Sequence, residues 1–359
     1  MDRQIITRRI KAIRNRLTRN DLDSLILTKP ANVTYTTAFM GADSWALITK
    51  RQTYLLTDSR YTEQAKSECR GCRIVERAET LPQTVAMLVA KSHSIKSVAL
   101  EQTTSLADFN ALKKHLKRTP KAVDRIVEAV RRQKDTAEIK TIKAAGAIAN
   151  RALKQTIPHI KPDITEIELA GLLDLQMRTL GATTSFDTIV AFGPNASRPH
   201  HQPGMRKLKK NDTILIDFGA RYKGYCSDIT RCFIVGRPTK LYRKVFEVVE
   251  LAQAAAIAQI KAGAMISDVD AAARNVIEKA DLPVYGHGTG HGLGLEIHED
   301  PFLKPEAKGT LEPGHIITIE PGVYMPGKLG VRIEDDVLVT KTGREILTRH
   351  CSHSPILPA

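Results

Sequence analysis

The first 120 residues alternate between helical and strand-like apolar patterns. Four aliphatic residues recur at the spacing of one helix face and predict an amphipathic first helix: Ile6, Ile10, Ile13 and Leu17. Short apolar and β-branched runs then alternate with further helical segments. The expected strands are 24–28, 45–49, 53–57, 73–76 and 97–101, and the later helices are 61–67, 81–91 and 106–116. This alternation predicts an α/β domain.

A change in composition follows this pattern. Thr119 and Pro120 interrupt the alternation, and a polar, basic stretch continues through Lys134. Proline restricts its own backbone and that of the residue before it, so it is typical of junctions. We therefore expect an α/β domain over residues 1–124 and a second domain over 125–359. The chain of 359 residues is long enough for two hydrophobic cores.

The second part of the chain contains a degenerate internal repeat. Residues 164–170 align with 266–272, and long helices are expected before them at 135–157 and 242–261. Both aligned segments carry a capping-box pattern at a helix start, Thr165 with Glu168 and Ser267 with Asp270. Each half then continues into an antiparallel hairpin. Two copies predict an α+β domain with pseudo-twofold symmetry, in which the hairpins meet at the axis.

Each predicted hairpin carries two acidic residues. Asp217 and Asp228 are equidistant from an expected turn centre at 222–223, and Glu320 and Glu334 are equidistant from the centre of the second hairpin. Residues equidistant from the turn lie opposite each other on one sheet face. Like charges in that position destabilise a sheet. Because bound cations would remove this repulsion, the pattern predicts a metal cluster, against the alternative of surface acids without a ligand.

A glycine-rich stretch between the hairpins adds histidine. The sequence YGHGTGHGLGLEIHE covers 285–299, where glycines flank His287 and His291. Glycine permits close backbone approach, and imidazole binds metals or transfers protons. One histidine with four carboxylates is an oxygen-rich set that suits Mn²⁺, Mg²⁺ or Co²⁺ better than a thiolate zinc site. Two such ions would balance four carboxylates and make a water nucleophilic near neutral pH.

Composition and net charge narrow the possible binding partners and the cellular location. The net charge is +15, but the basic residues are spread along the chain and aromatic residues make up only 5%, which leaves little material for stacking bases. We expect a solvated basic surface and no nucleic acid or membrane partner. Five cysteines without a secretory signal indicate free thiols and a cytoplasmic protein. Cys69 and Cys72 have C-x-x-C spacing, but we expect two free thiols that neither bind zinc nor act in redox chemistry.

At the acidic and histidine positions the chain resembles a known family. The stretches IDFGARYKGYCSDITR, GHGTGHGLGLEIHE, IEPGVY and VRIEDDVLVT resemble the pita-bread metallopeptidases, and among them the Xaa-Pro peptidases, aminopeptidase P and prolidase. The resemblance implies an N-terminal α/β creatinase-like domain and a pita-bread catalytic domain with a pseudo-twofold repeat. It also implies two divalent ions, manganese first and cobalt or zinc as alternatives. Their implied ligands are Asp217, Asp228, His291, Glu320 and Glu334.

The resemblance also implies roles for other residues. Glu320 is the expected general base, and Asp228 and Glu334 are expected to bridge the two ions. The remaining expected catalytic or substrate-binding residues are His200, His287, His298, Tyr324 and Arg332. His200 is preferred to the neighbouring His201 because the family motif contains one histidine at that place.

We therefore expect an Xaa-Pro aminopeptidase that acts on proline-containing peptides as a homodimer. The segment TDSRY (57–61) favours the aminopeptidase, and the alternative is a prolidase restricted to dipeptides. A methionine aminopeptidase would normally lack a domain like 1–124 and the arginine at Arg332. Creatinase-like enzymes and binding modules usually lose the metal ligands. An alternative of another class is a basic, non-catalytic nucleic-acid-binding protein on the same fold.

Overall fold

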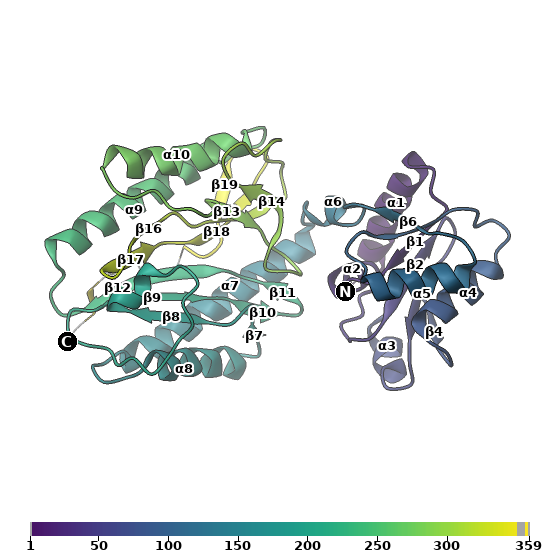
Figure 1. Ribbon diagram of the computed structural model, residues 1–359, viewed down its shortest axis with the longest axis horizontal. Coiled ribbons are helices and arrows are strands. Elements are labelled where there is room, and N and C mark those ends of the chain that lie inside the picture. The colour runs from purple at the N-terminus through teal and green to yellow at the C-terminus, as the bar shows by residue number, and fades with distance from the viewer. Residues whose placement is uncertain (1, 350–355, 358–359) are drawn as a thin grey trace. The chain divides into compact units, whose positions relative to one another are not determined.

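The computed structural model describes residues 2–349, 356 and 357. The chain divides into two compact units, Met1–Arg131 and Arg132–Ala359 (Figure 1). The first compact unit continues to Arg131. The domain boundary expected near residue 124 stays a prediction.

The smaller unit is an α/β domain built on one mixed sheet. Its six strands have the order β4-β3-β2-β1-β5-β6. The strands are β1 (Ser24–Leu27), β2 (Trp45–Thr49), β3 (Thr53–Thr57), β4 (Arg73–Glu76), β5 (Val98–Glu101) and β6 (Lys121–Val123). The helices are α1 (Arg3–Arg19), α2 (Pro30–Thr37), α3 (Thr62–Glu68), α4 (Leu81–Ala90), α5 (Leu106–Leu116) and α6 (Glu128–Arg131). The predicted α/β architecture is confirmed.

Helix α1 has the apolar face that its sequence predicts. Ile6, Ile10, Ile13 and Leu17 are all buried. Asp2 precedes the helix, and its carboxylate accepts a hydrogen bond from the backbone of Gln4. This N-cap satisfies a backbone donor that the first helical turn leaves unpaired.

Three elements of this unit were not expected from the sequence: α2, β6 and α6. Helix α2, with the sequence PANVTYTT, contains one strong helix former, Ala31, and half of its residues are β-branched. Its Thr36 and Thr37 hydroxyls bond to the carbonyls of Asn32 and Val33 in the preceding turn. Both threonines are fully buried, so tertiary packing overrides the weak propensity. The stretch after Pro120 contains β6 and α6, where only a polar junction was expected.

The larger unit consists of two similar halves. The first half contains the helices α7 (Thr136–Thr156) and α8 (Glu166–Thr179), and the 3₁₀ segments η1 (Ile157–His159) and η2 (Gly193–Ser197). Its strands are β7 (Thr183–Thr184), β8 (Ile189–Phe192), β9 (Thr213–Phe218), β10 (Ala220–Tyr222), β11 (Tyr225–Cys226) and β12 (Ile229–Val235). The sheet order β20-β12-β9-β8 includes β20 (Ile356–Leu357), and β7, β10 and β11 form a small sheet.

The second half repeats this plan. Helices α9 (Lys240–Gln259) and α10 (Ile266–Lys279) precede β13 (Gly290–Gly292), β14 (Glu299–Leu303), β15 (Ile316–Ile319), β16 (Gly322–Met325), β17 (Leu329–Arg332), β18 (Asp335–Val339) and β19 (Arg344–Ile346). The five-stranded sheet has the order β14-β13-β15-β18-β19, and β16 pairs with β17. Figure 1 shows the two helix pairs of this unit on opposite sides, with the sheets between them. Each helix pair covers its own apolar core.

The two helix starts differ in their caps. At α8 the predicted capping box is confirmed, because Thr165 and Glu168 exchange side-chain and backbone hydrogen bonds. The capping box predicted for Ser267 and Asp270 is wrong. Helix α10 begins after Met265 and has no side-chain cap. The Asp270 carboxylate instead accepts hydrogen bonds from the backbone and hydroxyl of Thr289, in the glycine-rich loop.

The predicted register of the first hairpin is also wrong. Asp217 on β9 lies opposite Thr230 on β12, not opposite Asp228. Lys223 and Gly224 both have positive φ, 48° and 84°, and form the two-residue turn. Such turns match the strand twist when glycine supplies one of the left-handed positions. Asp228 lies two residues before Thr230, so it shares the face of Asp217 but is a diagonal neighbour.

The second hairpin has the predicted register. Val323 pairs with Val331 and Tyr324 with Gly330, which centres the turn on Gly327. The pairing of Ile319 on β15 with strand β18 continues the same register below the hairpin. In this register Glu320 and Glu334 lie opposite each other on the two strands of the hairpin, as expected.

Candidate metal centre and active site

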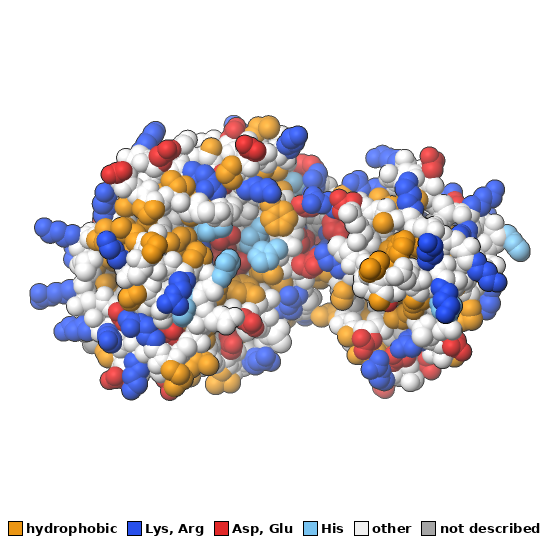
Figure 2. Space-filling model, viewed as in Figure 1, with side chains coloured by type: hydrophobic (Ala, Val, Ile, Leu, Met, Phe, Trp, Pro, Cys, Tyr) orange, Lys and Arg blue, Asp and Glu red, His pale blue; other side chains and the backbone are white. Residues whose placement is uncertain are grey.

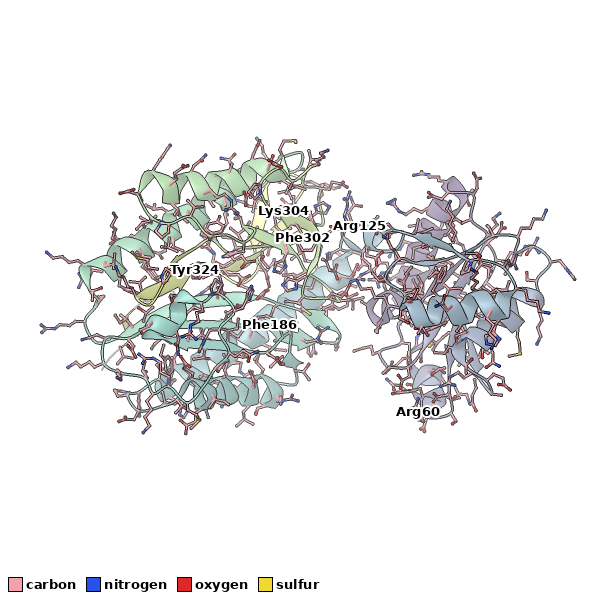
Figure 3. The ribbon with its side chains drawn as sticks, in the orientation of Figure 1. Arg60, Arg125, Phe186, Phe302, Lys304 and Tyr324 are labelled. Atoms are coloured by element: carbon pink, nitrogen blue, oxygen red, sulfur yellow. The ribbon has the colours of Figure 1, made fainter. Side chains whose placement is uncertain are left out.

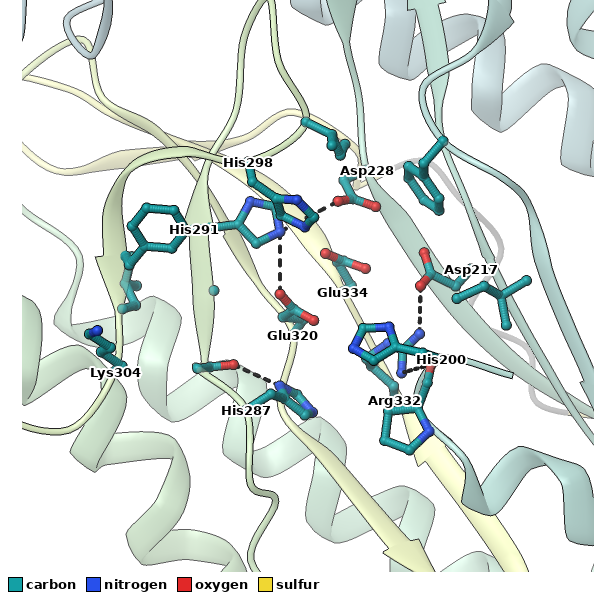
Figure 4. A pocket seen from close by; sticks show the side chains of 18 of the residues that line it. His200, Asp217, Asp228, His287, His291, His298, Lys304, Glu320, Arg332 and Glu334 are labelled. Atoms are coloured by element: carbon teal, nitrogen blue, oxygen red, sulfur yellow. Dashed lines mark hydrogen bonds and ion pairs between the residues drawn. The ribbon is translucent and has the colours of Figure 1, made fainter. Parts of the chain in front are cut away.

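A cavity of about 470 Å³ opens in the larger unit. Figure 2 shows histidine and carboxylate side chains together in a hollow of its surface. Nine of the ten predicted site residues line this cavity, and Tyr324 does not: the nine are His200, Asp217, Asp228, His287, His291, His298, Glu320, Arg332 and Glu334. Figure 4 shows carboxylates from both halves facing the same space.

The four metal-site carboxylates lie within a strand or directly next to the end of one. Asp217 lies within β9, and Asp228 directly precedes β12. Glu320 follows β15, and Glu334 lies between β17 and β18. Because equivalent strands of the two halves face each other, residues about one hundred positions apart in sequence converge on one cavity.

His291 is positioned by close backbone packing. It lies on β13 between two glycines, and a Cβ at Gly290 would lie 1.9 Å from the Thr318 carbonyl oxygen. Only glycine therefore allows β13 to approach β15 this closely. The His291 Nδ1–H donates to the Gly292 carbonyl at 3.0 Å. This fixes the tautomer in which Nε2 carries a lone pair directed into the cavity.

The Nε2 atom of His291 faces two carboxylates. It lies 3.7 Å from Asp228 Oδ2 and 3.5 Å from Glu320 Oε1. Burial lowers the pKa of His291 to about 4, so the imidazole is neutral near pH 7 and available as a ligand. One ligand atom each from Asp228, His291 and Glu334 lies within 4.8 Å of the others.

The acids of the cavity are held in an unfavourable state without cations. Burial raises the pKa of Asp228 well above its usual value, and repulsion from Glu334 raises it further. Burial and the charge of Glu320 do the same to the pKa of Glu334. Burial also raises the pKa of Glu320, to about 7. A group of buried carboxylates that repel one another is stable as anions only when positive charge is supplied.

Two oxygens indicate where that charge belongs. Asp217 Oδ1 and Asp228 Oδ1 are buried and have no hydrogen-bond partner among the described residues. Buried carboxylate oxygens without partners are costly. Together with the neutral His291 nitrogen, they form the oxygen-rich donor set that divalent cations prefer. The residues present therefore fit a metal centre.

Arg332 connects the acids to the second hairpin. Its Nη2 donates to Asp217 Oδ2 at 2.5 Å, its Nε to Thr230 Oγ1 at 3.0 Å, and its Nη1 to the Tyr324 hydroxyl at 2.8 Å. The residue is 3% exposed, so these donors are fixed in the protein interior. The guanidinium orients Asp217 and leaves its other oxygen free toward the cavity.

Thr230 is a site residue that the sequence analysis missed. Its hydroxyl donates to Glu334 Oε2 at 2.6 Å and accepts from Arg332. A threonine in a strand is ordinary, so its residue type gave no signal. The correct hairpin register would have revealed it, because Thr230 lies directly opposite Asp217.

The remaining histidines surround the acids. The rings of His291 and His298 meet edge to face with centroids 4.5 Å apart. The imidazole of His287 bonds to the Tyr324 hydroxyl at 3.1 Å, and its burial lowers its pKa to about 4. His200 lines the cavity, whereas the neighbouring His201 bonds to Glu166.

With this geometry, the comparisons with known proteins identify the family. A model described as metallopeptidase family M24 matches residues 140–341, and a creatinase/prolidase N-terminal domain model matches residues 9–133. The chain belongs to metallopeptidase family M24. The predicted fold, a creatinase-like domain followed by a pita-bread catalytic domain, is confirmed.

Three relatives of this M24 peptidase match along almost its whole length. An uncharacterized peptidase, YqhT, from Bacillus subtilis is 39% identical over 97% of this chain and 98% of its own. An Xaa-Pro dipeptidase from Bacillus anthracis has a TM-score of 0.94 and 37% identity, covering 98% of this chain and 100% of that one. An X-Pro aminopeptidase from Thermotoga maritima has a TM-score of 0.88 and 35% identity, covering 96% and 100%.

The helices and the cysteines relate to the expected location of the protein. In the described part of the chain, no helix combines the length and apolar character that crossing a membrane requires. Cys69, Cys72, Cys226 and Cys232 are free thiols, and Cys351 lies outside the described residues. The expected cytoplasmic location and homodimer stay predictions.

Proposed function

We propose that this M24 peptidase is an Xaa-Pro dipeptidase, which hydrolyses the bond between an N-terminal residue and a following proline. The observation that carries the proposal is the convergence of four acids and His291 on one cavity, beside three further histidines. The relatives support the substrate class, since both solved structures named above are Xaa-Pro or X-Pro peptidases.

The centre would hold two divalent ions, with manganese expected first. The residues that would bind them are Asp217, Asp228, His291, Glu320 and Glu334. When bound, such ions polarise a carbonyl and lower the pKa of water. Their positive charge would also offset the repulsion that raises the pKa values of Asp228 and Glu334.

The protein residues would then divide the proton transfers. Glu320 takes a proton from the attacking water as the water oxygen bonds to the carbonyl carbon. His298 and His200, on the cavity surface, donate hydrogen bonds to the oxygen that gains charge. The carbon–nitrogen bond breaks as the proline nitrogen receives the proton that Glu320 took from the water, which yields one amino acid and proline. Arg332 holds Asp217 throughout these steps.

The dipeptidase replaces the aminopeptidase that the sequence favoured. The solved dipeptidase has both the higher identity and the higher TM-score of the two structures described above. An Xaa-Pro aminopeptidase is the second candidate. It is supported by the T. maritima structure and by the TDSRY segment.

The test compares Ala-Pro, Ala-Pro-Ala and Ala-Ala as substrates of the Mn²⁺-loaded enzyme. We expect cleavage of Ala-Pro, a much lower kcat/KM for Ala-Pro-Ala, and no significant cleavage of Ala-Ala. Equal cleavage of Ala-Pro-Ala would support the aminopeptidase. Failure to cleave either proline substrate would refute both candidates.

A further inference from the structure

The three cavity histidines outside the proposed metal ligands are held in different ways. His287 bonds to the Tyr324 hydroxyl, and the ring of His298 packs edge to face against His291. His200 is exposed, and within the described part of the chain its ring has no hydrogen-bond or ion-pair partner. Figure 4 shows this ring directed into the cavity. The position of His200 therefore depends on the segment that carries it.

His201, the next residue along the chain, is firmly held. Its side chain is 9% exposed, and its Nε2–H donates to Glu166 Oε2 at 2.9 Å. An ionised carboxylate only accepts hydrogen bonds, so this contact assigns the proton to Nε2. Glu166 is the first residue of α8, and its side chain is 1% exposed. The histidine is thus fixed to a buried acid at the start of a helix.

Glu166 gathers the whole segment around one charge. Its carboxylate accepts four hydrogen bonds, all from residues 192–204: from the backbone of Phe192 at 2.8 Å, Asn195 Nδ2 at 2.9 Å, His201 Nε2 at 2.9 Å and the backbone of Gly204 at 3.1 Å. Burial acts to raise the pKa of Glu166, but these hydrogen bonds lower it below its usual value, so the carboxylate is ionised near pH 7. The two ends of the segment that contains His200 are therefore fixed to the same carboxylate.

A second contact holds the segment on the other side of His200. The Nη1 of Arg332 donates to the Pro199 carbonyl at 3.4 Å, which is longer than a typical hydrogen bond. The same nitrogen donates to the Tyr324 hydroxyl at 2.8 Å. Figure 3 shows Tyr324 in the middle of the larger unit, between its two helix pairs. Because the contact from Arg332 is long and shared, the bonds to Glu166 are the stronger restraint on the segment.

From this arrangement we propose that His201, held by Glu166, positions the imidazole of His200 against the oxygen that gains charge during cleavage. Consecutive residues share one planar peptide group, so fixing His201 restricts the backbone of His200. A hydrogen-bond donor stabilises a developing charge only when it is held at the correct distance. His201 is a positioning residue and does not touch the substrate. The inference rests on the proposed function, which gives His200 its contact with the substrate.

The test is a double-mutant cycle with Ala-Pro as substrate and the full-length, Mn²⁺-loaded enzyme. His201→Ala removes the donor to Glu166, and His201→Gln keeps an N–H donor. His200→Ala removes the positioned ring, and the double variant combines it with His201→Ala. Gln202→Ala is the matched control, because Gln202 is the next residue, is exposed and does not line the cavity. His201→Phe fills the space without a donor and takes the place of His201→Ala if that variant does not fold.

We expect His201→Ala to lower kcat about tenfold with little change in KM, because the donor is displaced and substrate binding is not lost. His200→Ala should lower kcat about a hundredfold. The double variant should match His200→Ala within about twofold, since His201 acts only through its neighbour. His201→Gln should restore most of the activity, and Gln202→Ala should behave as wild type. All rates are measured well below the melting temperature of each variant.

A crystal structure of His201→Ala gives a second measurement, which does not depend on bond cleavage. We expect a displaced His200 ring and unchanged metal-site carboxylates. An independent loss of about a thousandfold in the double variant, an unmoved His200 ring, or wild-type kinetics for His201→Ala would overturn the role of His201 and leave the proposed activity intact. If the wild-type enzyme did not cleave Ala-Pro, the proposed function would fail, and this inference with it.

Discussion

Substitution of Asp228 is expected to separate the loss of catalysis from the loss of folding. The residue is buried, carries an unpartnered oxygen and is repelled by Glu334. Asp228→Asn should therefore reduce kcat by at least about a thousandfold, while circular dichroism reports a folded protein. Asp281→Asn, on an exposed turn, is the control and should retain activity. Substantial activity of Asp228→Asn would contradict its place in the metal centre.

A second residue-scale prediction concerns pH and the metal-free protein. Burial raises the pKa of Glu320 from 4.5 to about 7, so the folded state binds this proton more tightly than the unfolded state does. Stability is then fully present below about pH 4.5 and is lost as the pH rises through about 7. We expect the chelated protein to melt a few degrees lower at pH 8 than at pH 5.5.

The control for this pH effect is Glu320→Gln, which should reduce the difference in melting temperature between the two pH values and leave the part that comes from Asp228 and Glu334. Adding Mn²⁺ at pH 8 should raise the melting temperature of the wild-type protein. A chelated protein more stable at pH 8 than at pH 5.5, with the same slope in Glu320→Gln, would argue against a strained carboxylate cluster.

Arg332 supports a third prediction, based on geometry and not on charge. Its planar fork reaches Asp217, Thr230 and Tyr324 at once. Arg332→Lys keeps the charge but not the fork, and we expect kcat to fall about a hundredfold with a smaller change in melting temperature. Wild-type kinetics for this variant would show that the orientation of Asp217 is not needed.

Much of the site could be predicted at this scale, and the omissions have a physical cause. Acids, histidines and glycines are distinctive in a strand context, so Asp217, His291 and Glu334 could be selected from the sequence. Thr230 was missed because its contribution is a hydroxyl in a common strand residue. Its role depends on the partner across the hairpin, which the residue type alone does not reveal.

At the scale of elements, the two helix starts of the larger unit provide a matched pair. Thr165 caps α8 through reciprocal bonds with Glu168, whereas α10 has no side-chain cap. Thr165→Ala should lower the free energy of unfolding by about 1 kcal/mol, and Ser267→Ala should change it little. Denaturant unfolding measures both values. An equal cost for the two substitutions would contradict the assigned caps.

The bounds of several helices and strands could be predicted from the pattern of apolar residues. Strands β2, β3 and β4 and helix α5 have the predicted bounds, because each combines a strong period with clear turn residues at its ends. Helix α2 and the register of the first hairpin were not predicted correctly. The former depends on burial of threonines, and the latter on a Lys-Gly turn whose two positive φ angles shift the centre by one residue.

At the scale of the whole molecule, the internal repeat was the decisive prediction. It placed the two acidic hairpins in corresponding positions, and the larger unit brings them to a single cavity. The net charge of +15 contributes nothing to this site, since the cavity itself is acidic. Composition alone therefore could not have separated a metal-dependent peptidase from a basic protein that binds nucleic acid.

The most direct test of the metal centre is anomalous X-ray diffraction from crystals soaked in Mn²⁺. We predict two anomalous peaks in the cavity, within bonding distance of Asp217, Asp228, His291, Glu320 and Glu334. The data also place each peak relative to Glu334 and Asp228, which are expected to contact both ions. Crystals that take up manganese elsewhere, or show no peak among these side chains, would contradict the account.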